Sequence, residues 1–240
     1  MRLKYLITGT GRCGTVFLAR LLTSAGINCG HEMFFNLDGL EGYLDRLQGI
    51  KSKEVSAVST LRLKNDVWET LSPWLIGPAE SDSSYLSAPF LGHETLLETK
   101  LIHVVRHPLK VVNSFINGLD YFGSQINGYE KNIYKWLPEL SEEMSQADRA
   151  SLYYILWNEM IEQKLAGKKY LFHRIEDDIQ PILDYTECSI PRTKLHSDTE
   201  TNTFLKKNSK VFKINDISRT FIKRKLVEIG ERYGYSMISL

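Results

Sequence analysis

The segment LKYLITGTGRCGT, residues 3–15, decides the fold. Residues 3–8 have the apolar character of a buried strand, and three glycines follow within residues 9–14. Residues 17–25 then carry Phe17, Leu18, Leu21, Leu22 and Ala25 at helical spacing. A strand, a glycine-rich turn and a helix in this order present free backbone N–H groups and a helix dipole to a phosphate or sulfate group. The segment therefore predicts an anion-binding loop.

The rest of the chain continues the alternation of strands and helices. Strand-like runs lie at residues 27–29, 54–60, 100–105 and 168–173, and helical patterns lie at 148–165 and 216–233. Pro108 stands where a helix begins, and Gly26 and Gly234 stand where helices end. Residues 78–92 are rich in Ser, Asp, Pro and Gly and are predicted to form a loop. The pattern predicts a three-layer α/β/α fold with a mainly parallel central sheet.

Composition limits the classes of partner. The chain has 240 residues, with 30 Lys and Arg against 29 Asp and Glu, so no overall attraction for nucleic acid is expected and any anion site is local. The three cysteines lack metal-ligand spacing, which favours a reducing, cytoplasmic location without disulfides or zinc. The N-terminal apolar run is too short for a membrane span. No linker or repeat divides the chain, so one domain over residues 1–240 is expected.

The loop differs from two familiar nucleotide-binding patterns. Gly9, Gly11 and Gly14 have the glycine spacing of a dinucleotide-binding fingerprint, but the next predicted strand has no acidic residue at its end except Glu32. The phosphate-loop pattern fits Gly9 and Gly14, but Thr15 replaces the lysine and Val16 replaces the hydroxyl that binds magnesium. The cation is instead Arg12, inside the loop, and a fixed cation with N–H groups can neutralise the charge on a sulfuryl donor. A purely structural strand-to-helix turn is the alternative for this segment.

A second segment carries another anion-binding pattern. In residues 101–116, Arg106 stands at the end of a predicted buried strand, and Ser114 lies on the helix predicted to begin near Pro108. The spacing allows Arg106 and Ser114 to converge on one anion. The alternative is a strand-end salt bridge with an exposed serine.

Together the two segments resemble the sulfotransferases that use 3'-phosphoadenosine 5'-phosphosulfate (PAPS). The family's 5'-phosphosulfate loop reads Lys or Arg, then Ser, Gly and Thr; residues 12–15 match except that Cys13 replaces the serine. Its 3'-phosphate motif has an arginine, a proline two residues later and a serine eight residues after the arginine, as in Arg106, Pro108 and Ser114. The resemblance implies a fold like that of the P-loop NTPases, PAPS as donor, PAP as product and no metal.

The resemblance also implies the residues of the donor site. They are Gly11, Arg12, Cys13, Gly14, Thr15, Val16, Arg106 and Ser114. Asn202 and Thr203, with Lys206 and Lys207, resemble the late loop that closes over the nucleotide, although a basic surface turn is equally consistent with them. Residues 174–177 resemble a corner of the family that is mainly structural.

Several groups are candidates for the base that accepts the acceptor's proton. Glu32 follows the second predicted strand, where related sulfotransferases carry a base, and His31 is the second candidate. Glu80 and Asp82 are rivals, and a solvated turn is the alternative interpretation of their segment. The predicted function is metal-free, in-line transfer of a sulfuryl group from PAPS to a hydroxyl or amine of a small molecule, glycan or peptide. The alternatives are a P-loop nucleotide-dependent kinase and a non-catalytic nucleotide-binding module.

Overall fold

The structure is a computed structural model that describes residues 2–48, 61–64, 67–70, 75, 78–123, 128–188 and 211–237. Its central sheet has five parallel strands in the order β2-β5-β1-β6-β7. They are β1 (Tyr5–Thr8), β2 (Cys29–His31), β5 (Ser81–Ser83), β6 (Lys100–Val105) and β7 (Tyr170–Arg174). A separate antiparallel pair is formed by β3 (Leu61–Lys64) and β4 (Val67–Thr70).

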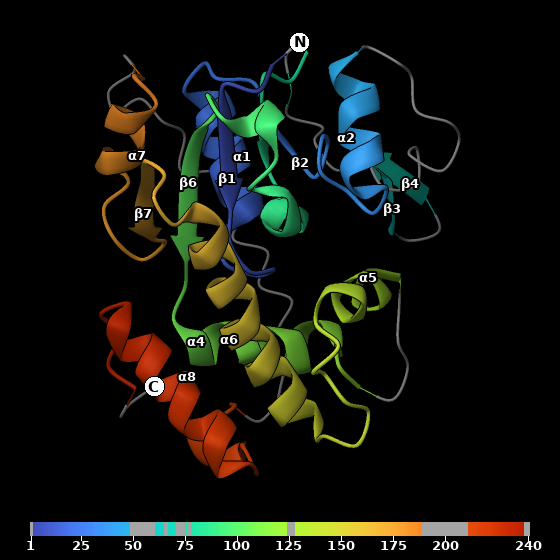
Figure 1. Ribbon diagram of the computed structural model, residues 1–240, viewed down its shortest axis with the longest axis vertical. Coiled ribbons are helices and arrows are strands. Elements are labelled where there is room, and N and C mark those ends of the chain that lie inside the picture. Colours follow the sequence, from blue (N-terminus) through green and yellow to red (C-terminus); the bar gives the residue numbers. More distant parts are fainter. Residues whose placement is uncertain are drawn as a thin grey trace.

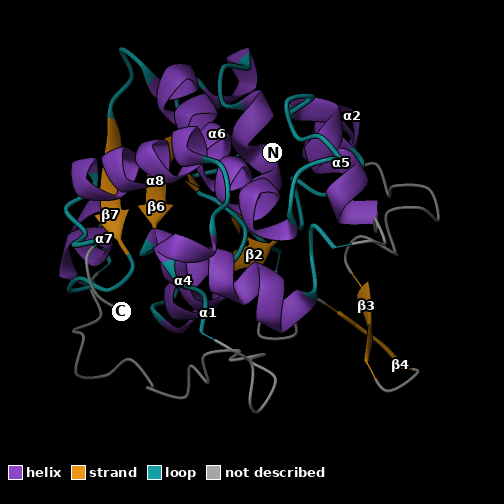
Figure 2. Cartoon of the chain, turned by 90° about the horizontal axis from the view of Figure 1, so that it is seen from below, coloured by secondary structure: helices purple, strands orange, loops and turns teal. Residues whose placement is uncertain are grey.

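Helices cover both faces of this sheet, as Figure 2 shows for α6 and α8 on one side and α1 on the other. The α-helices are α1 (Thr15–Ser24), α2 (Gly39–Leu47), α4 (Pro108–Asn113), α5 (Gly128–Trp136), α6 (Gln146–Leu165), α7 (Gln180–Tyr185) and α8 (Thr220–Arg232). Figure 1 shows that β6 points toward α4 and α5, so these two helices lie beyond the carboxyl ends of the strands. The three-layer, mainly parallel α/β/α fold predicted from the sequence is confirmed.

Alternating side chains of the strands supply two cores. Leu6, Leu101 and Val105 belong to the core shared with α6 and α8, whereas Ile7 and Ile102 belong to the core shared with α1 and α7. The period of two along β1 and β6 is the one expected of strands covered on both faces.

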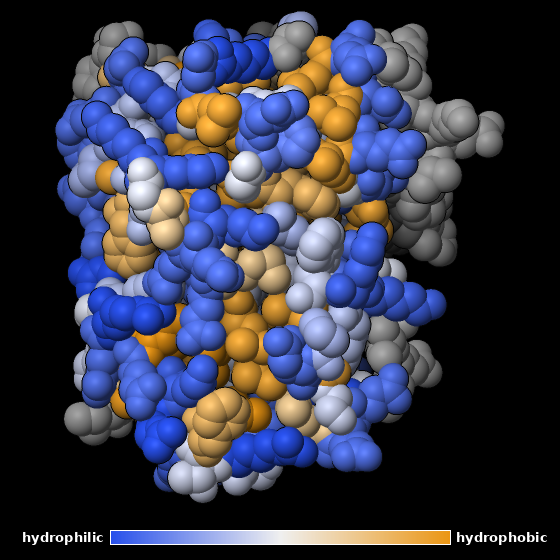
Figure 3. Space-filling model, viewed as in Figure 1, coloured by the Kyte–Doolittle hydropathy of each residue, from blue (hydrophilic) through white to orange (hydrophobic). Residues whose placement is uncertain are grey.

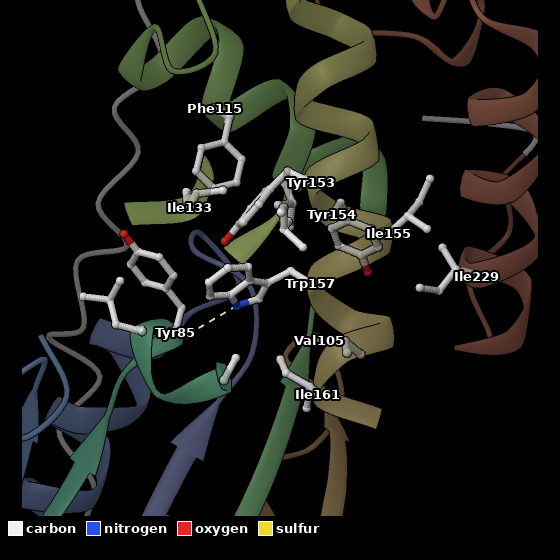
Figure 4. Packing of buried hydrophobic residues seen from close by; sticks show 14 of the residues in the cluster. Tyr85, Val105, Phe115, Ile133, Tyr153, Tyr154, Ile155, Trp157, Ile161 and Ile229 are labelled. Carbon is white, nitrogen blue, oxygen red and sulfur yellow. Dashed lines mark hydrogen bonds between the residues drawn. The ribbon is translucent and has the colours of Figure 1, made fainter. Parts of the chain in front are cut away.

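Helix α6 contributes three of the largest fully buried side chains (Figure 4). Tyr153, Tyr154 and Trp157 are fully buried, and Trp157 Nε1 donates a hydrogen bond of 3.3 Å to the carbonyl of Tyr85. His103 on β6 is also buried, at 3.1 Å from Asn158 through Nε2, and burial lowers its pKa to about 4. His103 therefore belongs to the core, as the sequence predicts.

One strand lies where the sequence predicts a loop. Strand β5 consists of Ser81, Asp82 and Ser83, all fully buried between β2 and β1. Asp82 and Ser83 are held by hydrogen bonds rather than by apolar contacts. The strand therefore shows no alternation of apolar residues in the sequence. A 3-10 helix, Tyr85–Phe90, follows at once, and Ser84 caps it by accepting the N–H of Leu86 at 3.1 Å. The prediction of a loop over residues 78–92 is therefore wrong in its central part.

The other boundaries differ by a few residues. The second strand begins at Cys29 rather than Ile27, and α8 begins at Thr220 rather than near residue 216. Gly26 and Gly234 have φ of 87° and 79°, the left-handed conformation expected just after a helix. The predicted strand at 54–60 lies outside the described residues.

Hydrophilic side chains are distributed over the face drawn in Figure 3, with apolar side chains visible between them. Within the described ranges, no helix combines the length and the apolar character that crossing a bilayer requires.

Candidate active site

The turn between β1 and α1 has a conformation that only certain residues adopt readily. Gly14, just before α1, has φ of 103°, and Arg12 has φ of 69° although it carries a side chain. At Gly9, a Cβ atom would lie 2.3 Å from the carbonyl oxygen of Val104, so the loop passes too close to β6 for any larger residue. The first-turn N–H groups of α1 have no acceptors within the helix and lie beside this loop. The turn therefore has the local structure of an anion-binding loop.

The predicted 5'-loop and 3'-phosphate motif meet at Arg12. Its Nε donates a hydrogen bond of 2.9 Å to Ser114 Oγ, and Arg106 donates through Nη1 to the carbonyl oxygen of Arg12 at 3.2 Å. The carbonyl of Arg106 accepts a hydrogen bond of 2.8 Å from the Tyr154 hydroxyl. The structure thus brings Arg12, Arg106 and Ser114 together.

The described part of the chain places no carboxylate against the guanidinium group of Arg106. Among the described residues, no Asp or Glu side chain lies within salt-bridge distance of its guanidinium group, which is only partly exposed. A second guanidinium group, that of Arg12, lies nearby. It donates to Ser114 Oγ, and the backbone carbonyl of Arg12 accepts from Arg106. Two adjacent cations in a partly buried setting are expected to attract an anion.

In the predicted PAPS site, the backbone N–H groups of two residues already donate hydrogen bonds within the protein. The N–H of Gly11 donates to the hydroxyl of Tyr153 at 3.0 Å, and that of Cys13 donates to the carbonyl of Thr10 at 3.4 Å. The Cys13 side chain is fully buried, and burial raises the pKa of its thiol to about 12. It is therefore a neutral packing group. The amides of Gly14, Thr15 and Val16 are the better placed donors, because they open α1.

Thr15, the first residue of α1, connects the loop to the candidate bases. Thr15 Oγ1 lies 3.1 Å from His31 Nε2, and the Thr15 carbonyl accepts a hydrogen bond of 2.9 Å from Ser83 Oγ. His31 Nε2 lies 3.7 Å from Glu32 Oε1. His31 therefore lies between the loop and Glu32.

Glu32 occupies a fixed and unusual position. It follows β2 with a left-handed φ of 55°, and only 5% of its surface is exposed. Burial, with the charge of Asp82 as a smaller contribution, raises its pKa to about 8, and the nearby Tyr129 hydroxyl opposes the shift. A carboxyl group with this pKa can exchange a proton near neutral pH, as a general base must.

Asp82 fixes the turn that carries Glu32. Its carboxylate accepts hydrogen bonds from the backbone N–H groups of Met33, Phe34 and Phe35, at 3.1, 3.1 and 3.0 Å. Burial raises the pKa of Asp82 to about 7, and the three amides oppose that shift. Asp82, for which the sequence suggests either a rival base or a solvated turn, is buried and anchors the turn after β2.

The other rival, Glu80, lies at the wrong edge of the sheet. It precedes β5, so it lies at the amino ends of the parallel strands, whereas the loop lies at their carboxyl ends. Its carboxylate forms a salt bridge of 2.6 Å with Lys4. Of the acidic candidates, only Glu32 combines the correct edge with proximity to the loop.

The corner at residues 174–177 is structural, as its resemblance implies. Arg174 donates two hydrogen bonds to Asp177, at 2.8 and 2.7 Å, and Glu176 accepts one of 2.7 Å from the Tyr235 hydroxyl. The side chain of Ile175 lies so close to Gly14 that a Cβ there would approach it to 2.7 Å. The corner therefore supports the loop from behind.

Some predicted residues cannot be placed, and some contacts were not predicted. Asn202, Thr203, Lys206 and Lys207 lie outside the described residues. Within the described ranges, no group of three or more His, Cys, Asp and Glu side chains could hold a metal ion. The contact of Tyr153 with Gly11 left no signal in the sequence, because the aromatic residues of that segment fit the core equally well.

The fold matches that of solved sulfotransferases. A sulfotransferase domain from the curacin biosynthetic pathway aligns over 99% of this chain and 99% of that domain, with a TM-score of 0.55 and 14% sequence identity. A sulfotransferase from Alicyclobacillus acidocaldarius aligns over 97% of this chain and 93% of its own, with a TM-score of 0.47 and 13% identity. No family model and no curated protein matches the chain. The first likeness shows a sulfotransferase-like α/β fold, which confirms the fold expected from the two motifs.

Proposed function

We propose that this chain is a PAPS-dependent sulfotransferase that moves a sulfuryl group to a hydroxyl or amine of an acceptor. The observation that carries the proposal is the meeting of Arg12, Arg106 and Ser114 at the carboxyl ends of β1 and β6. PAPS carries its 5'-phosphosulfate and its 3'-phosphate on different carbons of one ribose, so it requires two neighbouring anion sites, and this cluster joins the loop to the 3'-phosphate motif. The sulfotransferase-like fold supports the same function.

The residues divide the work of one in-line transfer. The Gly14 and Thr15 amides and Arg12 hold the sulfuryl and bridging oxygens, and Arg106 with Ser114 holds the 3'-phosphate. A bond forms from the acceptor oxygen to sulfur while the bond from sulfur to the bridging oxygen breaks, and that electron pair leaves with PAP. Glu32 takes the proton that the acceptor loses. Because Arg12 supplies the cation and Val16 offers no hydroxyl, we expect activity without magnesium.

The raised pKa of Glu32 sets the direction of the pH dependence. Glu32 accepts a proton only in its ionised form, and burial holds its pKa at about 8. The rate of transfer is therefore expected to rise as the pH rises through that value. His31, between Thr15 and Glu32, is the second candidate for this role.

We also propose that residues 1–240 form one domain and that the protein is cytoplasmic. Lys206 and Lys207 are proposed to contact PAPS, and the acceptor is proposed to be a small molecule, glycan or peptide.

Two measurements test the proposal. The first compares thermal stabilisation by PAP, by ADP and by ADP with magnesium; we expect stabilisation selective for PAP and insensitive to EDTA. The second follows turnover of sulfur-labelled PAPS against a library of alcohols and amines. Selective stabilisation by ADP with magnesium would favour a kinase, and PAP binding without turnover of any acceptor would favour a non-catalytic module.

A further inference from the structure

Two consecutive residues of α6, Tyr153 and Tyr154, each bind the backbone of one of the two anion-binding segments. The hydroxyl of Tyr153 accepts the N–H of Gly11, in the loop after β1, at 3.0 Å. The hydroxyl of Tyr154 donates to the carbonyl of Arg106, just after β6, at 2.8 Å. Both tyrosine side chains are fully buried. A single turn of one helix therefore contacts both segments.

The backbone groups that the tyrosines bind lie outside the sheet. Strand β1 ends at Thr8 and the adjacent strand β6 ends at Val105, so Gly11 and Arg106 both lie past the last paired residues. In the part of the chain that the structure describes, no other hydrogen bond reaches the Gly11 N–H or the Arg106 carbonyl. The two hydroxyls therefore extend the support of the sheet beyond the ends of its strands.

Helix α6 is itself fixed against the sheet. Asn158 Oδ1 lies 3.1 Å from His103 Nε2, and His103 belongs to β6. Trp157 Nε1 donates to the carbonyl of Tyr85, in the 3-10 helix that follows β5. All four of these residues are buried. The helix can therefore act as a rigid reference for the segments that its tyrosines bind.

The ring of Tyr153 also joins the two segments by packing. Its centroid lies 5.3 Å from that of Phe115, with the two rings perpendicular, as Figure 4 shows. Phe115 follows Ser114 of the 3'-phosphate motif, and a Cβ atom at Gly11 would lie 3.0 Å from Phe115 Cζ. Gly11 is thus enclosed between α6 and the second segment, and a shift of either changes the spacing between the two.

That spacing matters for a ligand that carries two anionic groups on one ribose. Once one group is bound, the other reaches its site at a high effective concentration, but only if the distance between the sites matches the ligand. A nucleotide with a single phosphate gains nothing from a correct distance. The preference for a doubly substituted nucleotide therefore measures how well the two segments are placed relative to each other.

We propose that Tyr153 and Tyr154 are positioning residues that set the spacing between the 5'-phosphosulfate loop and the 3'-phosphate site, and so select nucleotides that carry both groups. The inference rests on the donor site of the proposed function. In this assignment neither hydroxyl touches the nucleotide. Tyr153 acts through the Gly11 N–H and Tyr154 through the Arg106 carbonyl.

The chain offers a matched control for both tyrosines. Tyr5 is also buried, and its hydroxyl donates to the backbone carbonyl of Thr186 at 2.8 Å. As the first residue of β1, however, it lies at the opposite end of the strand from the loop. Tyr5→Phe therefore removes the same kind of hydrogen bond from the core without touching either segment.

The test compares three nucleotides in Tyr153→Phe, Tyr154→Phe, Tyr5→Phe and wild type. Isothermal titration measures the Kd of PAP, of adenosine 5'-monophosphate and of adenosine 3'-monophosphate. We expect Tyr153→Phe and Tyr154→Phe each to weaken PAP roughly three- to tenfold, the effect of one lost hydrogen bond, and each monophosphate less than about twofold. Tyr5→Phe should lose stability in urea unfolding but bind all three nucleotides as wild type does.

The phenylalanine variants keep their rings in the core, circular dichroism checks that they fold, and each tests the proposal independently. Equal weakening of all three nucleotides, unchanged PAP binding in the folded variants, or an equal loss of PAP affinity in Tyr5→Phe overturns the proposal. If wild type prefers PAP and the tyrosine variants lose that preference, but no acceptor is turned over, the positioning role holds and sulfuryl transfer fails. A wild type without a preference for PAP over the monophosphates overturns both.

Discussion

Arg12 is the residue on which the two anion-binding segments depend. Its side chain bonds Ser114, its carbonyl accepts from Arg106, and its backbone is held at φ of 69°, where non-glycine residues are uncommon. Such a conformation persists when its surroundings determine it. Because Arg12, Arg106 and Ser114 share contacts, the effects of substituting them are expected to be non-additive.

Arg106→Ala should weaken PAP binding by roughly 1.5 to 3 kcal/mol, the range for a hydrogen bond to a charged group. Ser114→Ala should lose less, because a serine hydroxyl contributes no charge. Isothermal titration with PAP and with adenosine 5'-phosphosulfate, which lacks the 3'-phosphate, measures both. The assignment of Arg106 to the 3'-phosphate is wrong if Arg106→Ala weakens both nucleotides equally.

Arg12→Ala and Glu32→Gln should fail in different ways. Loss of the Arg12 charge on the bridging oxygen should lower turnover roughly 10²- to 10³-fold. Glu32→Gln keeps the shape but takes no proton, so turnover should fall roughly 10²- to 10⁴-fold with PAP affinity nearly intact. An acceptor with an acidic hydroxyl, such as a nitrophenol, should partly rescue Glu32→Gln and rescue Arg12→Ala less. Near-normal turnover in Glu32→Gln would transfer the role of base to His31.

Among the secondary-structure elements, strand β5 connects the centre of the sheet to the candidate active site. Its three residues are polar and buried, and Asp82 and Ser83 bond to the turn after β2 and to Thr15, the first residue of α1. The strand therefore positions Glu32 and the anion loop relative to each other. A polar strand in the middle of a parallel sheet is unusual, because such strands are mostly continuous apolar runs.

Asp82→Asn should destabilise the fold. An asparagine amide group would point a donor at one or more of the N–H groups of residues 33–35, leaving buried donors unpaired at about 1 to 3 kcal/mol. Ser81→Ala is the matched control, because Ser81 is equally buried and its Oγ has no partner among the described residues. Urea unfolding should show a clear loss for Asp82→Asn and little change for Ser81→Ala. Similar losses in both would mean that the amide contacts of Asp82 contribute little.

The elements also show what the sequence could and could not predict. The sequence predicts strand β6 at its observed bounds, because four of the six residues of Lys100–Val105 are apolar and Pro108 follows shortly after. The spacing of the second motif predicts that Arg106 and Ser114 converge, whereas neither motif specifies the contacts of both residues with Arg12. Strand β5 was missed because its stability comes from hydrogen bonds rather than apolar periodicity. The bond from Gly11 to Tyr153 joins residues 142 positions apart, and no local pattern specifies such a partner.

For the whole molecule, the buried carboxyl groups connect function to stability. A carboxyl group whose pKa is raised by folding binds more protons in the folded than in the unfolded state, so stability falls as the pH rises between the two pKa values. Burial raises the pKa of Glu32 from 4.5 to about 8 and that of Asp82 from 3.8 to about 7. His103 acts in the opposite direction at lower pH, because burial lowers its pKa from 6.5 to about 4 and stability rises with pH across that window.

Wild type should therefore lose stability between about pH 5 and pH 8, the same range in which Glu32 ionises and transfer should accelerate. Glu32→Gln carries no titrating group at this position, so its free energy of unfolding should fall less over that range. The free energy of unfolding of wild type minus that of the variant should therefore decrease as the pH rises. Each pKa unit corresponds to about 1.4 kcal/mol, so the change in this difference should reach a few kcal/mol. Urea unfolding of both proteins at a series of pH values measures it, and the contributions of Asp82 and His103 largely cancel in the subtraction. A difference that does not change with pH would show that Glu32 ionises as readily in the folded protein as in the unfolded chain, and the alkaline rise in activity would then need another group.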